Sequence, residues 1–245
     1  GASEAARAPL LEVLRAFLAA GGRVIDSSPM YGRAEAVTGD LLARLGGAPR
    51  PFLATKVWTR GREAGEAQIR ESMHRLRADP LDLLQIHNLL DWETHLPTLR
   101  DLQARGRIRY VGITHYAETA FDELERVLRT QRVDFVQLPY SVSSREVERR
   151  LLPAAAETGT AVLVMRPFEE GALLRAVKGR PVPPWAAELE ATTWSQLFLK
   201  FILSHPAVTA VLPATANPKH LAENVQAGLG PLPDEKLRRR IVEAL

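Results

Sequence analysis

The sequence predicts an α/β protein built as a (β/α)8 TIM-type barrel. Short β-type runs alternate with segments of helical period almost from end to end, which is typical of a parallel α/β fold. The runs are continuously apolar, as expected where both faces of a parallel sheet are covered. No glycine-rich G-x-G-x-x-G turn follows the first strand, which argues against a doubly wound dinucleotide-binding sheet.

The alternation predicts seven strands separated by helices. The strands are expected at 23–26, 51–56, 82–86, 108–113, 134–138, 160–165 and 208–212. The helices are expected at 8–20, 34–46, 64–78, 92–105, 117–130, 144–158, 192–204, 218–228 and 234–244. A closed barrel of this class has eight strands, so we expect a first barrel strand to be absent from this chain. The whole range 1–245 is interpreted as a single domain, with the proline-rich stretch 178–190 as a loop at the barrel mouth.

The composition is that of a soluble globular protein, with 46% hydrophobic and 25% charged residues. The 32 basic and 29 acidic side chains nearly cancel, which does not favour a nucleic-acid partner. The absence of cysteine excludes disulfides and thiolate metal sites. No apolar run approaches the roughly 20 residues needed to cross a bilayer, so we expect a cytoplasmic protein with no membrane partner, with export left open.

Polar side chains stand at the ends of the first three predicted strands. Asp26 ends the first strand, Tyr31 lies in the loop after it, Lys56 ends the second strand, and His87 follows the third. Taken alone, Asp26 could be a helix cap and His87 a structural histidine. In a barrel, however, the active site is built at the carboxyl ends of the strands, and Asp26 could there pair with Lys56. The histidines follow no metal-ligand spacing, so we predict no metal site.

At this point the sequence resembles the aldo-keto reductase family. The resemblance rests on five stretches in order, which read "GGRVIDSSPMYGRAEAVTGDLL", "LATKVW", "LDLLQIH", "GRIRYVGITHY" and "LPATANPKHLAEN". Family members are (β/α)8 barrels that begin with a small hairpin and a first barrel strand. The resemblance therefore implies that this N-terminal hairpin and strand are missing from the chain.

The resemblance also implies NAD(P)H-dependent reduction of an aldehyde or ketone, or oxidation of the alcohol, by hydride transfer. The family's catalytic tetrad falls on Asp26, Tyr31, Lys56 and His87. Tyr31 is expected to act as general acid and base, with the Lys56 ammonium lowering its pKa. Asp26 would hold Lys56 in place, and His87 would donate a hydrogen bond to the substrate oxygen.

The nicotinamide end of the cofactor site follows the family pattern with changes. Gln137 matches the glutamine that holds the carboxamide, whereas Thr114 and His115 stand where the family has serine and asparagine. The aromatic residue that often stacks on the nicotinamide is replaced here by Met165. His115 could contact either the nicotinamide or the substrate.

The phosphate and adenine end is expected in the last two loops of the barrel. The expected contacts are, in chain order, Arg166, Phe168, Thr215, Lys219, His220, Glu223 and Asn224. An arginine can meet the pyrophosphate or stack on a ring, and a helix beginning near 218 would help to bind phosphate. NADP(H) is favoured and NAD(H) remains possible.

Substrate identity and oligomeric state are not determined by the sequence. Trp58, two residues after Lys56, and Tyr116 are the expected walls of the substrate pocket. A rival interpretation is a nicotinamide-binding regulatory or interaction subunit on the same barrel with little turnover. A metal-dependent barrel hydrolase using His87 and Asp26 would need a further histidine cluster, which the sequence lacks.

Overall fold

The computed structural model describes residues 4–46 and 50–245. It contains one parallel sheet in which the strands follow each other in chain order. The strands are β1 (Val24–Asp26), β2 (Phe52–Val57), β3 (Leu81–Ile86), β4 (Ile108–Thr114), β5 (Phe135–Pro139), β6 (Ala161–Met165) and β7 (Val208–Val211). The seven predicted strands are confirmed, each to within one residue at either end.

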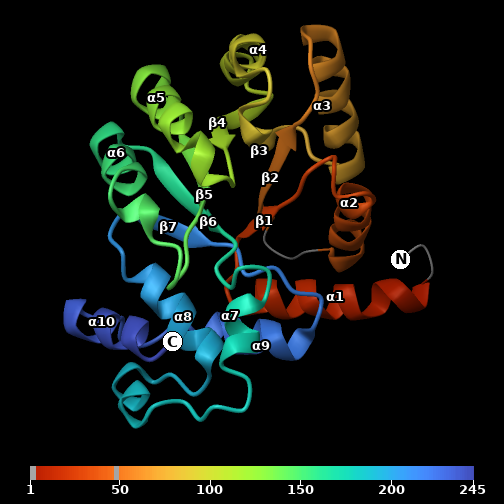
Figure 1. Ribbon diagram of the computed structural model, residues 1–245. Helices are drawn as coiled ribbons and strands as arrows, with labels where there is room; N and C mark the ends of the chain where they lie inside the picture. Colours follow the sequence, from red (N-terminus) through yellow and green to blue (C-terminus); the bar gives the residue numbers. More distant parts are fainter. Residues whose placement is uncertain (1–3, 47–49) are drawn as a thin grey trace.

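The helices surround this sheet in a nearly closed barrel (Figure 1). They are α1 (Glu4–Ala19), α2 (Ala34–Leu45), α3 (Arg62–Leu76), α4 (Trp92–Ala104), α5 (Phe121–Gln131), α6 (Leu151–Thr158), α7 (Ala172–Ala176), α8 (Trp194–Leu203), α9 (Pro218–Gln226) and α10 (Glu235–Glu243). Strands β1 and β7 are the two edges of the sheet, yet α1 packs against α9, so the outer layer of helices closes where the strands do not pair. Over the described ranges, none of the helices has the length and apolarity needed to cross a membrane.

The helix predicted at 144–158 is shorter than expected. Its first part is a turn and a 3-10 segment, Glu146–Glu148, and α6 begins only at Leu151. The Ser141 hydroxyl accepts the backbone N–H groups of Ser143 and Ser144, which holds the chain in a turn. Pro153 then falls in the first turn of α6, where its missing N–H costs no helical hydrogen bond. The proline-rich stretch 178–190 is not purely a loop either, because Pro184–Leu189 forms a 3-10 helix.

The two faces of the strands have different surroundings. On β3, Leu84 and Ile86 point outward into the large core between sheet and helices, whereas Leu83 points into the barrel. Successive side chains of a strand alternate between faces, so residues 85 and 87 share the inner face with Leu83. The inner core is apolar at the amino ends of the strands, where it is lined by Phe52 and Phe135. On β3 the inward-facing polar side chains, Gln85 and His87, thus lie at the carboxyl end of the strand.

The contact between α2 and α3 leads to a prediction about stability. A methyl group on Gly39 of α2 would lie 2.2 Å from the backbone oxygen of Arg75 on α3. Because backbone atoms cannot swing aside, Gly39→Ala should lower the free energy of unfolding by about 1–3 kcal/mol in urea denaturation. At Gly228 the same methyl group meets only the Val225 oxygen at 3.4 Å, so Gly228→Ala is the control and should change it by less than about 0.5 kcal/mol. Equal effects of the two variants would contradict this explanation.

Candidate active site

Asp26 and Lys56 form an ion pair at the carboxyl ends of β1 and β2. The Lys56 ammonium lies 2.6 Å from Asp26 Oδ2, as expected from their positions on neighbouring strands, and also donates to the Ser27 carbonyl oxygen at 2.8 Å. The side chains are only 2% and 10% exposed. Two charges so far removed from water are tolerated only when paired and hydrogen-bonded, and this geometry supplies both conditions.

Two amide side chains complete the hydrogen bonding of Asp26. Gln85 Nε2 donates to Asp26 Oδ1 at 3.1 Å, and Gln137 Nε2 donates to Asp26 Oδ2 at 3.2 Å. Since Gln137 comes from β5, this second bond crosses the barrel interior. Gln85 is not among the site residues predicted from the sequence, although its position two residues before His87 places it on the same face of β3. Gly112 on β4 leaves room for it, because a methyl group there would lie 2.9 Å from Gln85 Cγ.

Tyr31 lies over this ion pair. The Lys56 nitrogen is 5.4 Å from the centre of the Tyr31 ring, and the His87 ring lies edge-on at 6.3 Å. Although 48% of Tyr31 is exposed, burial of the remainder raises the pKa of its hydroxyl, the Asp26 charge raises it further, and Arg166 lowers it. The expectation that Lys56 lowers this pKa is therefore wrong here. The ammonium is engaged by Asp26 and the Ser27 carbonyl, and its charge is balanced by Asp26.

His87 is buried beside Tyr31 and is held by Ser28. The Ser28 Oγ lies 3.3 Å from His87 Nδ1 and accepts the Met30 N–H at 3.4 Å. The Ser28 hydroxyl can donate to Nδ1 or accept from it, so the direction of this bond depends on which ring nitrogen carries the proton. Burial, together with the Lys56 charge and His115, lowers the pKa of His87 to about 4. The imidazole is consequently neutral near pH 7 and offers one N–H donor.

Aromatic side chains line the rim around these groups. Trp58 follows β2 with its ring 6.2 Å from His87, and Tyr116 stacks on His115 at 5.6 Å after β4. The Arg166 guanidinium lies 4.4 Å from the centre of the Tyr116 ring. Trp58 and Tyr116 remain 41% and 44% exposed. Both residues predicted as pocket walls thus stand at the open end of the barrel.

A groove of about 600 Å³ runs along the last two loops and the start of α9. Six residues predicted to hold a cofactor line it, namely Arg166, Phe168, Thr215, His220, Glu223 and Asn224. Lys219 is not among its lining residues, and its backbone N–H instead caps α9 by donating to Asn217 Oδ1 at 2.9 Å. Arg166 forms an ion pair of 3.1 Å with Glu170, which also lines the groove.

The nicotinamide residues predicted from the sequence lie on adjacent strands at the mouth. Thr114 ends β4 in register with Gln137 on β5, and the His115 N–H donates to the Gln137 carbonyl oxygen at 3.3 Å. Gln137 uses its amide nitrogen on Asp26, which leaves its Oε1 buried with no hydrogen-bond partner. A buried acceptor without a donor favours a ligand that brings an N–H group, as a carboxamide does. The residues present therefore fit a nicotinamide cofactor.

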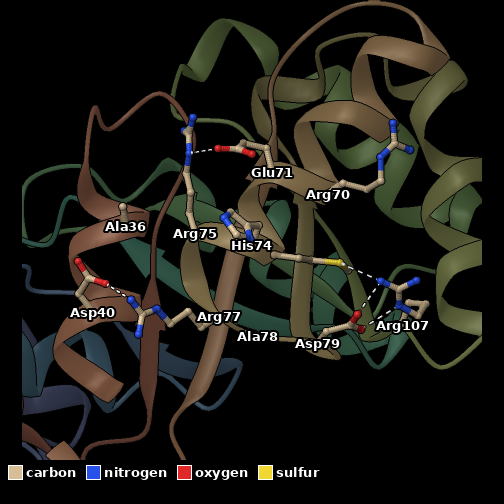
Figure 2. Close-up of a pocket in the computed structure, with 11 residues that line it drawn as sticks. Ala36, Asp40, Arg70, Glu71, His74, Arg75, Arg77, Ala78, Asp79 and Arg107 are labelled. Carbon is tan, nitrogen blue, oxygen red and sulfur yellow. Dashed lines mark hydrogen bonds and ion pairs between the residues drawn. The ribbon is translucent and has the colours of Figure 1, made fainter. Parts of the chain in front are cut away.

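A second hollow, of about 770 Å³, is lined by residues of α2, of α3 and of the segments that precede β3 and β4 (Figure 2). Its lining includes Ala78 and Asp79 just before β3 and Arg107 just before β4. Several of its arginines are paired within it, as in the Arg107–Asp79 contact of 2.6 Å. None of the site residues predicted from the sequence lines this hollow. Elsewhere too, no group of three His, Asp or Glu side chains in the described ranges is placed to hold a metal ion.

The comparison with known families decides the relationship of this chain. The sequence profile described as "Aldo/keto reductase family" matches residues 2–241. The chain belongs to the aldo-keto reductase family. The family resemblance drawn from the five motifs and the barrel fold are both confirmed.

Individual relatives of this aldo-keto reductase are distant but extensive matches. The methylglyoxal reductase YeaE of Escherichia coli is 28% identical over 218 residues, covering 86% of this chain and 76% of that protein. The NADH-specific methylglyoxal reductase of the same organism is 26% identical over 92% of this chain and 85% of its own length. A crystal structure of an aldo/keto reductase from Klebsiella pneumoniae in complex with NADP and acetate superposes with a TM-score of 0.82 at 26% identity, covering 100% of this chain and 87% of that one.

The lowered pKa of His87 predicts how the stability of this aldo-keto reductase changes with pH. Between about pH 4 and pH 6.5 the histidine is protonated in the unfolded chain but stays neutral in the folded protein. The contribution of His87 to the free energy of unfolding is therefore complete above pH 6.5 and is lost as the pH falls toward 4. From pH 7 to pH 4.5 this residue should remove about 2 kcal/mol from the free energy of unfolding. The measurement is urea denaturation at both pH values. The decrease in the free energy of unfolding should be smaller in His87→Gln than in the wild type, and unchanged in the exposed control His74→Gln. An equal decrease in the wild type and both variants would show that His87 is not its cause.

Proposed function

We propose that this chain is an active NAD(P)H-dependent carbonyl reductase in which Tyr31 is the general acid of reduction and the general base of oxidation. The observation that carries the proposal is the meeting of Tyr31, Lys56, Asp26 and His87 at one rim of the barrel. A carbonyl carbon that receives hydride leaves negative charge on its oxygen. A proton donor and a second hydrogen-bond donor at that oxygen are therefore the groups that the reaction requires.

Tyr31 is a neutral phenol in the resting site. Because burial and Asp26 both favour the neutral phenol, Tyr31 is protonated near pH 7 and has a proton to give when reduction begins. The phenolate left behind would lie close to the Lys56 ammonium, whose nitrogen is 5.4 Å from the ring centre. Lys56 would thus act on the product of the proton transfer more than on the resting phenol.

His87 would hold the substrate oxygen at the start of the reaction. If the Ser28 hydroxyl donates to Nδ1, the neutral ring would offer its proton from Nε2 to the substrate oxygen. A neutral hydrogen-bond donor would stabilise the developing oxyanion without giving up its own proton, so that Tyr31 would remain the residue that transfers a proton to the substrate. Asp26 holds the ammonium of Lys56 and is itself held by Gln85 and Gln137, so it acts through Lys56 on the reacting atoms.

The cofactor would lie in the groove along the last two loops with its nicotinamide at the rim. When bound, the reduced nicotinamide supplies the hydride. Gln137 would accept from the carboxamide, Thr114 and His115 would contact the same end, and Arg166 would leave Glu170 to meet the pyrophosphate. Thr215 and His220 at the start of α9 would receive the 2′-phosphate, helped by Lys219. We favour NADP(H) for this reason, although one relative is NADH-specific by name.

The first substrate to test is methylglyoxal, because two relatives are methylglyoxal reductases. The aromatic rim formed by Trp58 and Tyr116 would also accept a planar, apolar aldehyde. The same measurements separate this proposal from a nicotinamide-binding regulatory subunit, since such a subunit would bind the cofactor without oxidising it in the presence of any aldehyde.

Replacement of Tyr31 by Phe tests the proposed acid. In single-turnover oxidation of bound NADPH by methylglyoxal, Tyr31→Phe should slow the chemical step at least about a hundred-fold while leaving the dissociation constant of NADPH within about two-fold. Tyr110→Phe is the matched control, because Tyr110 lies in the inner core at the other end of the barrel. An unchanged rate in Tyr31→Phe would remove this residue from the proposed role.

Cofactor choice is tested by titrating the protein with NADPH and NADH. If Lys219 and His220 contact the 2′-phosphate, Lys219→Met and His220→Asn should each weaken NADPH binding about ten-fold and leave NADH binding nearly unchanged. Lys236→Met removes another exposed lysine, on α10, and serves as the control. Equal losses for both nucleotides would mean that these residues do not recognise the phosphate.

A further inference from the structure

The loop after β2, residues 58–61, carries Trp58 and is fastened by three side chains of neighbouring elements. We infer that Gln68 and His95 are positioning residues which hold Trp58 beside His87 and thereby set the width of the substrate pocket. Neither residue belongs to the groups that the proposed chemistry uses. The inference rests on the proposed function, since it concerns the substrate wall of the same site.

Gln68 of α3 binds the backbone of Trp58 at both ends. Its Oε1 accepts the Trp58 N–H at 2.6 Å, and its Nε2 donates to the Trp58 carbonyl oxygen at 3.2 Å. One amide group thus replaces the ladder partners that the chain loses when it leaves β2 at Val57. The two bonds fix the position and the rotation of the Trp58 backbone. The indole itself stays 41% exposed and is free to contact a ligand.

His95 of α4 holds the next residue of the loop. Its ring is fully buried, and Nε2 lies 2.7 Å from the Thr59 carbonyl oxygen, which can only accept a hydrogen bond. The proton is therefore on Nε2, and Nδ1 is left buried without a partner. Gly65 makes this position possible, because a methyl group there would lie 2.6 Å from His95 Cε1. A buried polar ring that packs against a glycine and makes a hydrogen bond indicates that His95 holds the loop backbone and does more than fill the core.

Asp91 holds the end of the loop. Its Oδ2 accepts the Gly61 N–H at 2.7 Å, while Oδ1 accepts the Thr94 hydroxyl at 2.8 Å. These hydrogen bonds lower the pKa of Asp91 and keep it an acceptor. The loop is thereby bound at Trp58, Thr59 and Gly61, from two helices and the turn between β3 and α4.

The consequence is a wall of defined position. The centre of the His87 ring lies 6.2 Å from that of the Trp58 ring and 6.3 Å from that of the Tyr31 ring. A substrate whose carbonyl oxygen meets His87 must fit its remaining atoms against Trp58. Loosening the loop should therefore affect a substrate with a planar ring much more than one without, and should leave proton and hydride transfer intact.

The test compares Gln68→Met, which keeps the length of the side chain but loses both bonds, with Gln68→Glu, which keeps the acceptor for the Trp58 N–H. Gln103→Met is the matched control. The Gln103 side chain of α4 also donates to a backbone oxygen, that of Arg109 3.0 Å away, but at the amino end of β4. A general loss of packing would affect both positions alike. Only Gln68→Met should affect Trp58.

Two measurements are made on each variant. Acrylamide quenching of the Trp58 emission, obtained by subtracting the same variant carrying Trp58→Phe, should rise about two-fold in Gln68→Met and stay unchanged in Gln103→Met. With saturating NADPH, the KM for para-nitrobenzaldehyde should rise about five-fold in Gln68→Met, the KM for methylglyoxal less than about two-fold, and kcat should hold for both. Gln68→Glu should restore most of the wild-type KM.

The outcomes are distinguishable. Unchanged quenching in Gln68→Met, an equal rise in KM for both aldehydes, or the same changes in Gln103→Met would each overturn the inference. A wild-type protein that binds NADPH but reduces neither aldehyde would instead refute the proposed function, and the quenching experiment would still decide whether Gln68 holds Trp58.

Discussion

The ion pair between Lys56 and Asp26 is the interaction on which the mouth of this barrel depends. It joins β1, a three-residue edge strand, to β2, and it lies where water is nearly absent. Removing one partner of such a buried pair typically costs about 3–5 kcal/mol, because the other charge is left without compensation. The surrounding bonds from Ser27, Gln85 and Gln137 follow from this need. The charges that the proposed chemistry uses are therefore also structural elements of the fold.

The interior of the barrel has an apolar part and a polar part, and the polar part surrounds the buried charges of Lys56 and Asp26. At the amino ends of the strands the interior is filled by apolar side chains such as Phe52 and Phe135. At the carboxyl ends it holds polar groups that form hydrogen bonds with one another. Strand alternation makes this division possible, since one strand can send Leu83, Gln85 and His87 inward while its other residues pack against helices. Gln137 Oε1, a buried amide oxygen without a hydrogen-bond partner, is the atom at which we propose that the carboxamide of the cofactor binds.

The differences from the family pattern gather at the rim and not in the tetrad. Tyr116 stacks on His115 and contacts the Arg166 guanidinium, and Arg166 is itself paired with Glu170. The contact between Arg166 and Tyr116 does not follow from the sequence, because it joins the loops that leave β6 and β4. The same holds for the fastening of Trp58 by Gln68 and His95, which lie on helices whose packing sets the distances. In the arrangement that we propose, these loop-to-helix contacts around the strand ends would set the specificity of the site.

The sequence by itself determined the seven parallel strands, the barrel and the positions of Asp26, Lys56 and His87 at strand ends, because these follow from local periodicity and from the place where each apolar run stops. Tertiary structure alone decided that α6 begins at Leu151, that Gln85 binds Asp26, and that the pKa of Tyr31 is raised and not lowered. Those features depend on how completely one group is surrounded and on which neighbour claims its hydrogen bonds. Both are properties of distances between residues far apart in the chain, which no local pattern of residues records.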